Sequence, residues 1–380
     1  MTLKLNRSLE MFLWIGLVLA FQGCAAEPAQ VSTTNQNGPN SEGTAIASYM
    51  DQLKESDFAG AILVAQKGEV IYQAGIGLAD VDDQVAITPQ TVFDIGSLSK
   101  QFTAAAILHL EQQGKLSVDD TLDMYFAEIP ADKAEITLHQ LLTHSAGLPP
   151  YVYAGDFVET SRDEAQKLAL EAELEFEPSS EYLYSDTGYG LLATIIEIVS
   201  GQSFPDYLHQ NLFDPAGMVQ TGFYNDAKWL ELTVANGYNN GQDFGSAATR
   251  PGPYWGLIGF GGVLSTTGDL YLWSQALAEN KILSAASREK LFTPYVQEYD
   301  DGPSFYGYGW VIEPLPTEAE QTLIWHDGAT DSQNAIMLIA PDFDQTVIIV
   351  LSNKIDESLF SENFYGIDAG FEILGLLLDA

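Results

Sequence analysis

The stretch FDIGSLSKQFTAAAILHLEQQG, residues 93–114, joins a short β-like segment to an alanine-rich apolar segment with a helical pattern. Ser97 lies at the junction and Lys100 follows three positions later, so both side chains share one face of the expected helix. A serine hydroxyl becomes a nucleophile only when a base takes its proton. The apolar run after Lys100 predicts burial, which disfavours the ammonium form and makes an amine available as that base. The positive end of the helix dipole would also stabilise negative charge that develops at Ser97.

The Ser-x-x-Lys spacing alone is a weak signal, because a serine that caps a helix ahead of a surface lysine has the same spacing. A second instance, Ser287–Lys290, lies in a charged segment that we interpret as an exposed helix without a catalytic role. The chain has no Gly-x-Ser-x-Gly sequence, which disfavours an esterase of the α/β-hydrolase fold. His139 and His144 are five positions apart and no His-Glu-x-x-His sequence occurs, so we predict no metal site and no cofactor.

The composition is that of a globular and strongly acidic protein. The chain has 380 residues, of which 46% are apolar, enough for one large unit or two subdomains with a sizeable core. Its formal net charge of −38 repels nucleic acids and anionic lipid head groups, so we expect no nucleic-acid partner. The acidic residues are spread along the chain, which is typical of a solvated surface rather than of an interaction tail.

The first residues have the layout of an export signal. Lys4 and Arg7 precede the apolar run MFLWIGLVLAF, residues 11–21, which is shorter than the roughly 20 residues of a transmembrane helix. Cys24 follows shortly after and is the sole cysteine, so no intrachain disulfide can form. We therefore predict a signal peptide at residues 1–23.

This segment resembles a bacterial lipoprotein signal, in which cleavage precedes a cysteine that then carries lipid. The resemblance implies lipidation of Cys24, and a periplasmic or cell-surface protein that contacts the membrane only through this anchor. Phe21 stands where such signals usually have Leu, and an ordinary signal peptide cut after Ala25 or Ala26 is the alternative. Residues 24–44 are small and polar, which predicts a flexible tether.

Strand-like segments lie at both ends of the remaining chain. A hairpin is expected around Lys67-Gly68, and strands recur from residue 305 onward, whereas residues 115–250 are mainly helical in pattern. A helix is expected to begin near Ala45. This order predicts an α/β (α+β) domain at residues 45–378, with an antiparallel sheet flanked by helices and built from both chain ends, and with an inserted all-helical subdomain.

The segment FDIGSLSKQFTAAAI resembles the first active-site motif of class C serine β-lactamases and their relatives. These relatives include penicillin-binding DD-carboxypeptidases, D-aminopeptidases and family VIII-type esterases. Further segments look like family segments in family order, over residues 45–375: ITLHQLLTHSAGLPPY, YLYSDTGYGLLATIIEIVSG, GFGGVLSTTGDLYLW and IWHDGATDSQNAIMLIAPD. The resemblance implies a β-lactamase/transpeptidase-like fold and a serine hydrolase activity.

The family's second motif, Tyr-x-Asn, corresponds here to Tyr184-Ser185-Asp186. The resemblance implies that the Tyr184 phenol relays protons while the Lys100 ammonium stabilises its phenolate. The literal match Tyr238–Asn240 lacks the surrounding family pattern, and we interpret it as a turn. Two alternatives remain for Asp186: it belongs to a Ser-Asp motif like that of class A enzymes, or it caps a helix that begins near Thr187.

The third motif is His326-Asp327-Gly328, the only His-x-Gly sequence in the chain. Gly328 leaves room for a substrate against the strand backbone. The resemblance implies that the Ala329 amide faces the Ser97 amide as an oxyanion hole. The alternative for His326 is a strand histidine whose hydrogen bonds are satisfied within the protein.

Two departures from class C enzymes bear on the substrate. Asp186 replaces an asparagine, and a carboxylate only accepts hydrogen bonds, so it receives a substrate carbonyl poorly. His326 replaces a lysine and is cationic only part of the time near neutral pH. Both changes weaken the case for an anionic β-lactam as the main substrate.

The sequence therefore predicts an extracytoplasmic serine hydrolase that forms an acyl-enzyme with an ester or amide. The candidate substrates are peptides, cell-wall fragments and small esters, and we expect no efficient β-lactamase activity. The alternative is a non-catalytic, penicillin-binding-like lipoprotein that binds cell-wall peptides, although intact Ser97, Lys100 and Tyr184 argue against it. The sequence leaves the oligomeric state open.

Overall fold

The computed structural model describes residues 41–299, 302–317, 319–355 and 365–379, within a compact unit that spans residues 39–380. The expected signal peptide, Cys24 and most of the expected tether lie outside these residues. The first helix, α1, is Ser41–Glu55, so it begins at Ser41 rather than at the expected Ala45. None of the helices in the described part of the chain combines the length and the apolar character needed to cross a bilayer.

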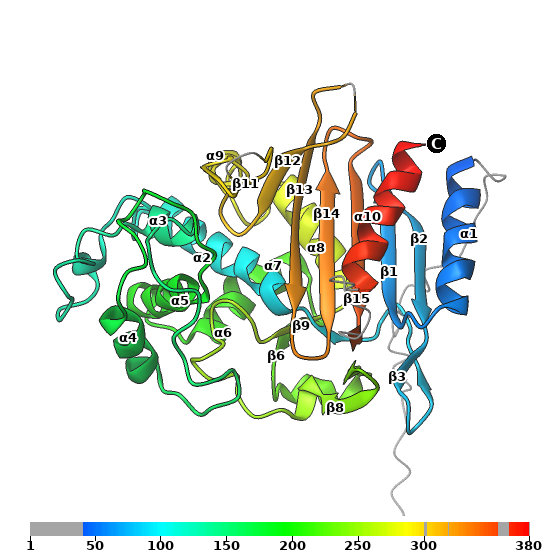
Figure 1. Cartoon of the computed structure of the whole chain (residues 1–380), viewed down its shortest axis with the longest axis horizontal. Helices are drawn as coiled ribbons and strands as arrows, with labels where there is room; N and C mark the ends of the chain where they lie inside the picture. Colours follow the sequence, from blue (N-terminus) through cyan, green and yellow to red (C-terminus); the bar gives the residue numbers. More distant parts are fainter. Residues whose placement is uncertain (1–40, 300–301, 318, 356–364, 380) are drawn as a thin grey trace, which may run out of the picture. The chain divides into compact units, whose positions relative to one another are not determined.

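The central element is an eight-stranded sheet in the order β10-β11-β12-β13-β14-β15-β1-β2, with every neighbouring pair antiparallel (Figure 1). The hairpin predicted around Lys67-Gly68 is confirmed as β1 and β2. β1 pairs with β15, which confirms a sheet built from both ends of the chain. The strands are β1 Gly60–Gln66, β2 Glu69–Ile76, β10 Val296–Gln297, β11 Phe305–Tyr306, β12 Val311–Pro314, β13 Thr322–Ala329, β14 Asn334–Ala340 and β15 Thr346–Ser352.

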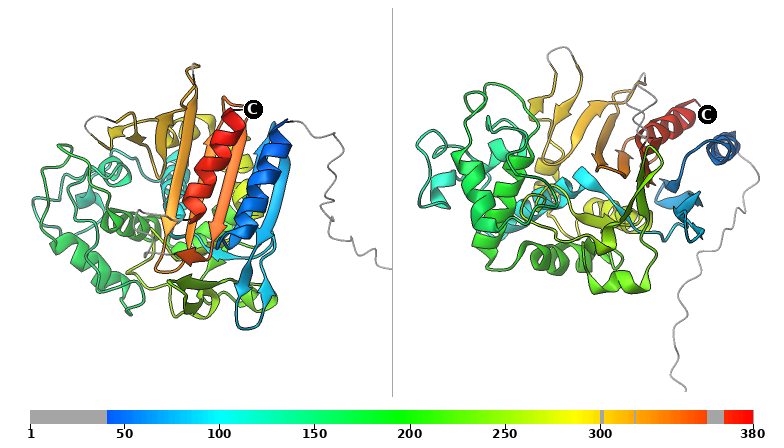
Figure 2. Two further views of the ribbon diagram at one scale, coloured as in Figure 1. Left: turned by 45° about the vertical axis from the view of Figure 1, so that its right-hand side comes forward. Right: turned by 60° about the horizontal axis from the view of Figure 1, so that its bottom comes forward.

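Helices cover both faces of this sheet. The helices α1 and α10 (Tyr365–Leu378) lie side by side on one face (Figure 2), and α8 (Thr267–Ala278) packs on the other. Successive residues of a strand point to opposite faces. Ile62 and Val350 accordingly belong to the core under α1 and α10, whereas the paired Leu63 and Ile349 belong to the larger core around α2 and α8. Because both faces are buried, β1 and β15 are near-continuous apolar runs without polar alternation.

The helical part of the chain packs around α2 (Lys100–Gln112) and α5 (Asp186–Ser200). Its other elements are η1 Gly96–Ser99, η2 Leu122–Met124, α3 Leu138–Leu142, α4 Arg162–Glu171, α6 Phe204–Leu208, the π-helical η3 His209–Phe213, α7 Asp214–Ala216, η4 Ala227–Glu231, η5 Ala247–Thr249 and α9 Ala285–Leu291. Almost the whole of α2 is buried, which explains its run of alanines and leucines, since a central helix has no polar face.

The insertion is not all-helical, which corrects the sequence-based expectation for residues 115–250. Within that range β6 (Gly222–Phe223) pairs with β9 (Val263–Ser265), and β7 (Asn236–Asn239) pairs with β8 (Gln242–Ser246). The remaining short strands are β3 Leu78–Asp80, β4 Val85–Ala86, β5 Phe93–Asp94 and β16 Lys354–Ile355. These strands were missed because they are short, and β5, β6 and β16 also pair with distant segments, so they carry no extended alternation of their own.

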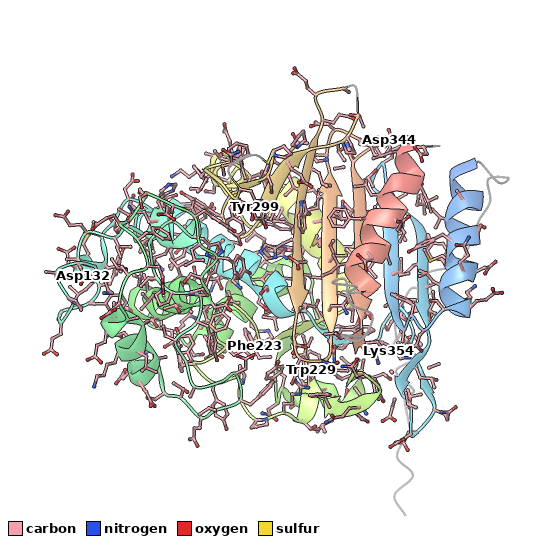
Figure 3. The ribbon with its side chains drawn as sticks, in the orientation of Figure 1. Asp132, Phe223, Trp229, Tyr299, Asp344 and Lys354 are labelled. Atoms are coloured by element: carbon pink, nitrogen blue, oxygen red, sulfur yellow. The ribbon has the colours of Figure 1, made fainter. Side chains whose placement is uncertain are left out.

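Two local features of this region follow directly from its residues. Asn240 and Gly241 both have positive φ angles and connect β7 to β8, a turn that suits Asn-Gly. The literal Tyr-x-Asn match therefore ends in a hairpin turn. Nearby, the Trp229 indole donates a hydrogen bond of 2.6 Å to the Phe223 carbonyl, and both residues are buried (Figure 3).

Candidate active site

The turn that carries Ser97 lies directly against the end of β13. Gly96 adopts φ +52°, and a Cβ there would lie 2.8 Å from the Ala329 amide nitrogen. A Cβ on Gly328 would lie 2.0 Å from the Ile95 carbonyl oxygen. Both positions require glycine because the two backbones touch. This contact brings the segment that bears the Ser97 amide and the segment that bears the Ala329 amide together.

A buried carboxylate beneath this turn was not predicted from the sequence. Asp94 accepts a hydrogen bond of 3.1 Å from the Gly96 amide and another from the Tyr224 hydroxyl. Burial raises the pKa of Asp94, and the Tyr224 hydrogen bond opposes that rise. The available signal was a polar residue inside the apolar FDIG segment, but its tyrosine partner lies far away in the sequence.

Lys100 is the first residue of α2, and its side chain is 0% exposed. Its ammonium nitrogen lies 3.0 Å from Ser97 Oγ and 2.6 Å from Asp186 Oδ1. The Phe260 carbonyl oxygen lies at 3.5 Å. Burial lowers the pKa of Lys100, while the Asp186 carboxylate acts in the opposite direction. The predicted Ser97–Lys100 contact is present, in a 3-10 turn followed by a helix rather than in one continuous helix.

Tyr184 packs against Lys100, the lysine that contacts Ser97. Its ring centroid is 4.5 Å from Lys100 Nζ. Burial raises the pKa of Tyr184 well above its usual value, the Asp186 charge adds to the rise, and the Ser97 side chain opposes it. The structure thus brings Ser97, Lys100 and Tyr184 into one cluster.

Asp186 does not cap helix α5, contrary to one of the sequence-based alternatives. The N-cap is Ser185, whose Oγ accepts a hydrogen bond of 3.2 Å from the Gly188 amide. Asp186 is the first helical residue, and its carboxylate is directed to Lys100 instead. An N-cap side chain can reach the amide three residues ahead, which leaves the carboxylate of the next residue free for the ion pair.

His326 lies on β13, is 2% exposed and does not line the pocket. Its Nδ1 lies 2.5 Å from the Asp327 carbonyl oxygen, and its Nε2 lies 2.9 Å from the Tyr306 hydroxyl. A carbonyl oxygen only accepts, so Nδ1 carries the proton of the neutral ring and Nε2 is left to accept. Burial lowers the pKa of His326, which favours this neutral form. The arrangement matches the alternative interpretation, a strand histidine with satisfied hydrogen bonds.

His144 packs against Tyr184. It is buried, its Nδ1 accepts a hydrogen bond of 3.0 Å from the Ser185 amide, and its ring centroid is 4.4 Å from that of Tyr184. Burial lowers the pKa of His144 well below its usual value. His139 instead contacts the Tyr308 hydroxyl at 2.8 Å. Both histidines have structural surroundings, as the sequence suggested.

A pocket of about 340 Å³ opens beside Ser97. Ser97, Asp186 and Ala329 all line it, so three of the predicted site residues from three separate segments share one cavity. The rest of the wall, which no sequence pattern indicated, includes the aromatic residues Tyr151, Phe157, Tyr224 and Phe260 and the acidic residues Asp156 and Asp331. The part of the chain that the structure describes contains no group of three or more His, Cys, Asp or Glu side chains arranged to hold a metal ion.

A nucleophilic serine, a buried lysine and a tyrosine at the edge of an antiparallel sheet define a serine hydrolase of the β-lactamase and penicillin-binding type. The family profile described as Beta-lactamase matches residues 46–369. The chain belongs to this family and is a serine hydrolase of this type, which acts on amides or esters.

The relatives agree with this assignment. Penicillin-binding protein 4* of Bacillus subtilis (strain 168) is 31% identical over 331 residues, which cover 81% of this chain and 71% of the relative. The octameric penicillin-binding protein homologue from Pyrococcus abyssi is 29% identical with a TM-score of 0.74, covering 88% of this chain and 77% of the other. The D-amino acid amidase from Ochrobactrum anthropi SV3 is 21% identical with a TM-score of 0.76, covering 90% and 99%, and shows a shared fold.

Proposed function

We propose that this protein hydrolyses an ester or amide through an acyl-enzyme on Ser97, outside the cytoplasm. The observation that carries the proposal is the 3.0 Å contact between Lys100 Nζ and Ser97 Oγ at the edge of a pocket, with the Tyr184 ring 4.5 Å from the same nitrogen. These groups can act as a nucleophile, a proton acceptor within hydrogen-bond distance, and a second proton carrier beside them.

The directions of the two pKa shifts order the proton transfers. Burial lowers the pKa of Lys100 and raises that of Tyr184, so within the pair the proton is favoured on the phenol and disfavoured on the amine. The Lys100 amine then takes the Ser97 proton as Oγ bonds to the substrate carbonyl carbon, and Asp186 stabilises the resulting ammonium. Tyr184 gives its proton to the departing alcohol or amine and is reprotonated from Lys100.

The amide groups of Ser97 and Ala329 hold the oxyanion of the tetrahedral intermediate in this proposal. Their backbones meet at Gly96 and Gly328, so both donors are held by packing before the substrate arrives. A water molecule later attacks the acyl carbon, the same groups carry its proton in reverse, and the Ser97 hydroxyl is restored.

The proposed substrates are peptides, cell-wall fragments or small esters. The penicillin-binding name of the Bacillus relative and the amidase activity of the Ochrobactrum protein support acyl donors of this kind. Efficient penicillin hydrolysis is not the proposed role, because among the described residues no lysine or arginine lines the pocket and Asp186 cannot donate a hydrogen bond. Export and attachment through Cys24 are supported by the N-terminal sequence pattern.

A substrate panel tests this proposal: p-nitrophenyl esters, D-Ala-D-Ala peptides, D-aminoacyl anilides and nitrocefin, each with wild-type protein and with Ser97→Ala. We expect hydrolysis in at least one non-lactam class and its loss in Ser97→Ala. Activity that survives the substitution would remove Ser97 from the reaction. Nitrocefin turnover at about 10 per second or faster, which is typical of enzymes, would contradict the proposal that efficient penicillin hydrolysis is not the role of this protein.

The second candidate function is capture of cell-wall peptides without turnover. It is favoured by the 2.6 Å ion pair of Lys100 with Asp186, because a carboxylate that holds the lysine as ammonium leaves Ser97 without a base. Binding of a D-Ala-D-Ala peptide by calorimetry, with no product release in the panel, would favour this function over hydrolysis.

A further inference from the structure

The carboxylates around the pocket beside Ser97 differ in whether they have a cationic partner. Three carboxylates line it: Asp156, Asp186 and Asp331. Asp186 has Lys100 as a cationic partner at 2.6 Å, and Asp331 has Arg250 at 3.2 Å. Asp156 is different, because its direct partner among the described residues is neutral: the Tyr151 hydroxyl donates to Asp156 Oδ1 at 2.9 Å.

Asp156 lines the same pocket as Ser97. Its charge also acts to raise the pKa of Lys100, the lysine that contacts Ser97. Burial raises the pKa of Asp156 and the charges of Asp186 and Asp331 raise it further, whereas the Tyr151 hydrogen bond and the more distant Arg250 charge lower it. A carboxylate held near two others and partly removed from water is stabilised by any cation that enters the pocket.

The remaining wall of the pocket also suits a cation. Phe157, Tyr224 and Phe260 present aromatic rings, whose faces attract positive charge. Phe157 already does so within the protein, since the Arg250 guanidinium carbon lies 4.8 Å from its ring centroid. The walls therefore combine apolar surface for an alkyl chain with one carboxylate that forms no ion pair within the described part of the chain.

We propose that Asp156 and the aromatic wall form a subsite for a positively charged amino group on the substrate, close to the carbonyl that Ser97 attacks. This inference rests on the proposed function and names the substrate class of the same site: esters or amides that carry an alkylammonium group. The ammonium pairs with the Asp156 carboxylate, and its alkyl groups contact the rings.

Two esters of equal size and shape but different charge test the proposal. p-Nitrophenyl 4-(trimethylammonio)butanoate carries a cation, and p-nitrophenyl 5,5-dimethylhexanoate is its neutral isostere. For the wild-type protein we expect kcat/KM to be at least about tenfold higher for the cationic ester, and this preference should shrink as salt is added because salt screens charges. If both esters are hydrolysed in a Ser97-dependent way without a preference, the subsite is wrong while the hydrolase function stands. If neither is hydrolysed, the proposed function fails with it.

Three variants test whether Asp156 causes the preference for the cationic ester. Asp156→Asn should lower the ratio of the two kcat/KM values to about twofold or less, mainly by raising KM for the cationic ester. Arg250→Gln should raise the ratio, because it removes the cation paired with Asp331 at the rim. Asp51→Asn, an exposed acid on α1 paired with Lys54, should leave the ratio unchanged.

A preference that is unchanged in Asp156→Asn would overturn the assignment. Circular dichroism shows whether that variant folds, and if it does not, the assignment depends on Arg250→Gln and on the salt dependence of the wild-type ratio. An Arg250→Gln variant with the wild-type ratio of the two kcat/KM values would then contradict the assignment. A wild-type ratio that does not change with salt would also contradict it.

Discussion

The chain contains the Ser-x-x-Lys pattern twice, and the two copies have different surroundings. At Ser97 the lysine is fully buried and contacts the serine at 3.0 Å. In α9 the Lys290 side chain is 44% exposed and pairs with Glu111 at 2.8 Å, while Ser287 bonds to the Ser284 hydroxyl at 3.0 Å. The same spacing on a helix therefore gives a reactive pair only where tertiary packing removes the lysine from water and directs it to the serine.

The largest expected effect comes from the two lysines. Lys100→Met should lower kcat/KM for the best substrate by about 10³-fold, because proton transfer to a positioned base contributes factors of about 10² to 10⁴. Lys290→Met should change it by less than about twofold. Ester hydrolysis by both variants at one pH checks this contrast, and equal losses would mean that burial does not distinguish the two copies.

Next in size is the loss of the second proton carrier. Tyr184→Phe keeps the ring beside Lys100 but removes the phenol hydroxyl. We expect a loss of about 10²-fold in kcat. Tyr182→Phe, which removes a nearby hydroxyl bonded to Glu298, is the matched control and should retain most of the activity. Near-wild-type turnover by Tyr184→Phe would show that Lys100 works without the phenol.

The turn that places Ser97 gives a smaller effect, on stability. Gly96→Ala adds a Cβ 2.8 Å from the Ala329 nitrogen at a positive φ, and should lower the free energy of unfolding by about 2 kcal/mol. Gly114→Ala shares a positive φ, at +69°, but meets open space, so it should cost only about 1 kcal/mol. Urea denaturation of both variants measures the difference. Equal costs would mean that the contact with β13 is not tight.

The smallest expected effect is a displacement of the pH profile. The Asp186 charge favours the ammonium form of Lys100 and so raises the pKa of that lysine. Removing the charge in Asp186→Asn lowers this pKa, the free amine appears at lower pH, and the rise of kcat/KM with pH should move to lower pH. Glu111→Gln, which removes the partner of Lys290, should not move it. A profile that moves to higher pH in Asp186→Asn would contradict the role of Lys100 as base.

Much of the fold and the reacting cluster could be predicted from the sequence because their signals are local or carried by the family resemblance. The β1–β2 hairpin follows from a turn dipeptide between two apolar runs, and Ser97 and Lys100 lie one helical turn apart. The wall of the pocket could not be predicted in this way. Asp156, Asp186 and Asp331 come from three distant segments, and only the folded chain shows that they share a cavity.

The dependence on residues far away in the sequence also explains why the expectations for Asp186 and His326 needed correction. Ser185 and Asp186 are both good helix-capping residues, and the choice between them depends on Lys100, which lies far away in the sequence. The burial of His326 likewise depends on Tyr306 from a neighbouring part of the sheet. The sequence shows which residues are polar, but the packing of the folded chain determines which of them a substrate can reach.

Covalent labelling tests the central claim most directly. The intact protein is treated with a fluorophosphonate probe, digested, and the modified peptide is located by mass spectrometry. The account predicts one adduct, on Ser97, that disappears in Ser97→Ala and is slowed in Lys100→Met, with Ser287 unmodified. An adduct on another serine, or unlabelled Ser97 in protein that still hydrolyses an ester, would contradict it.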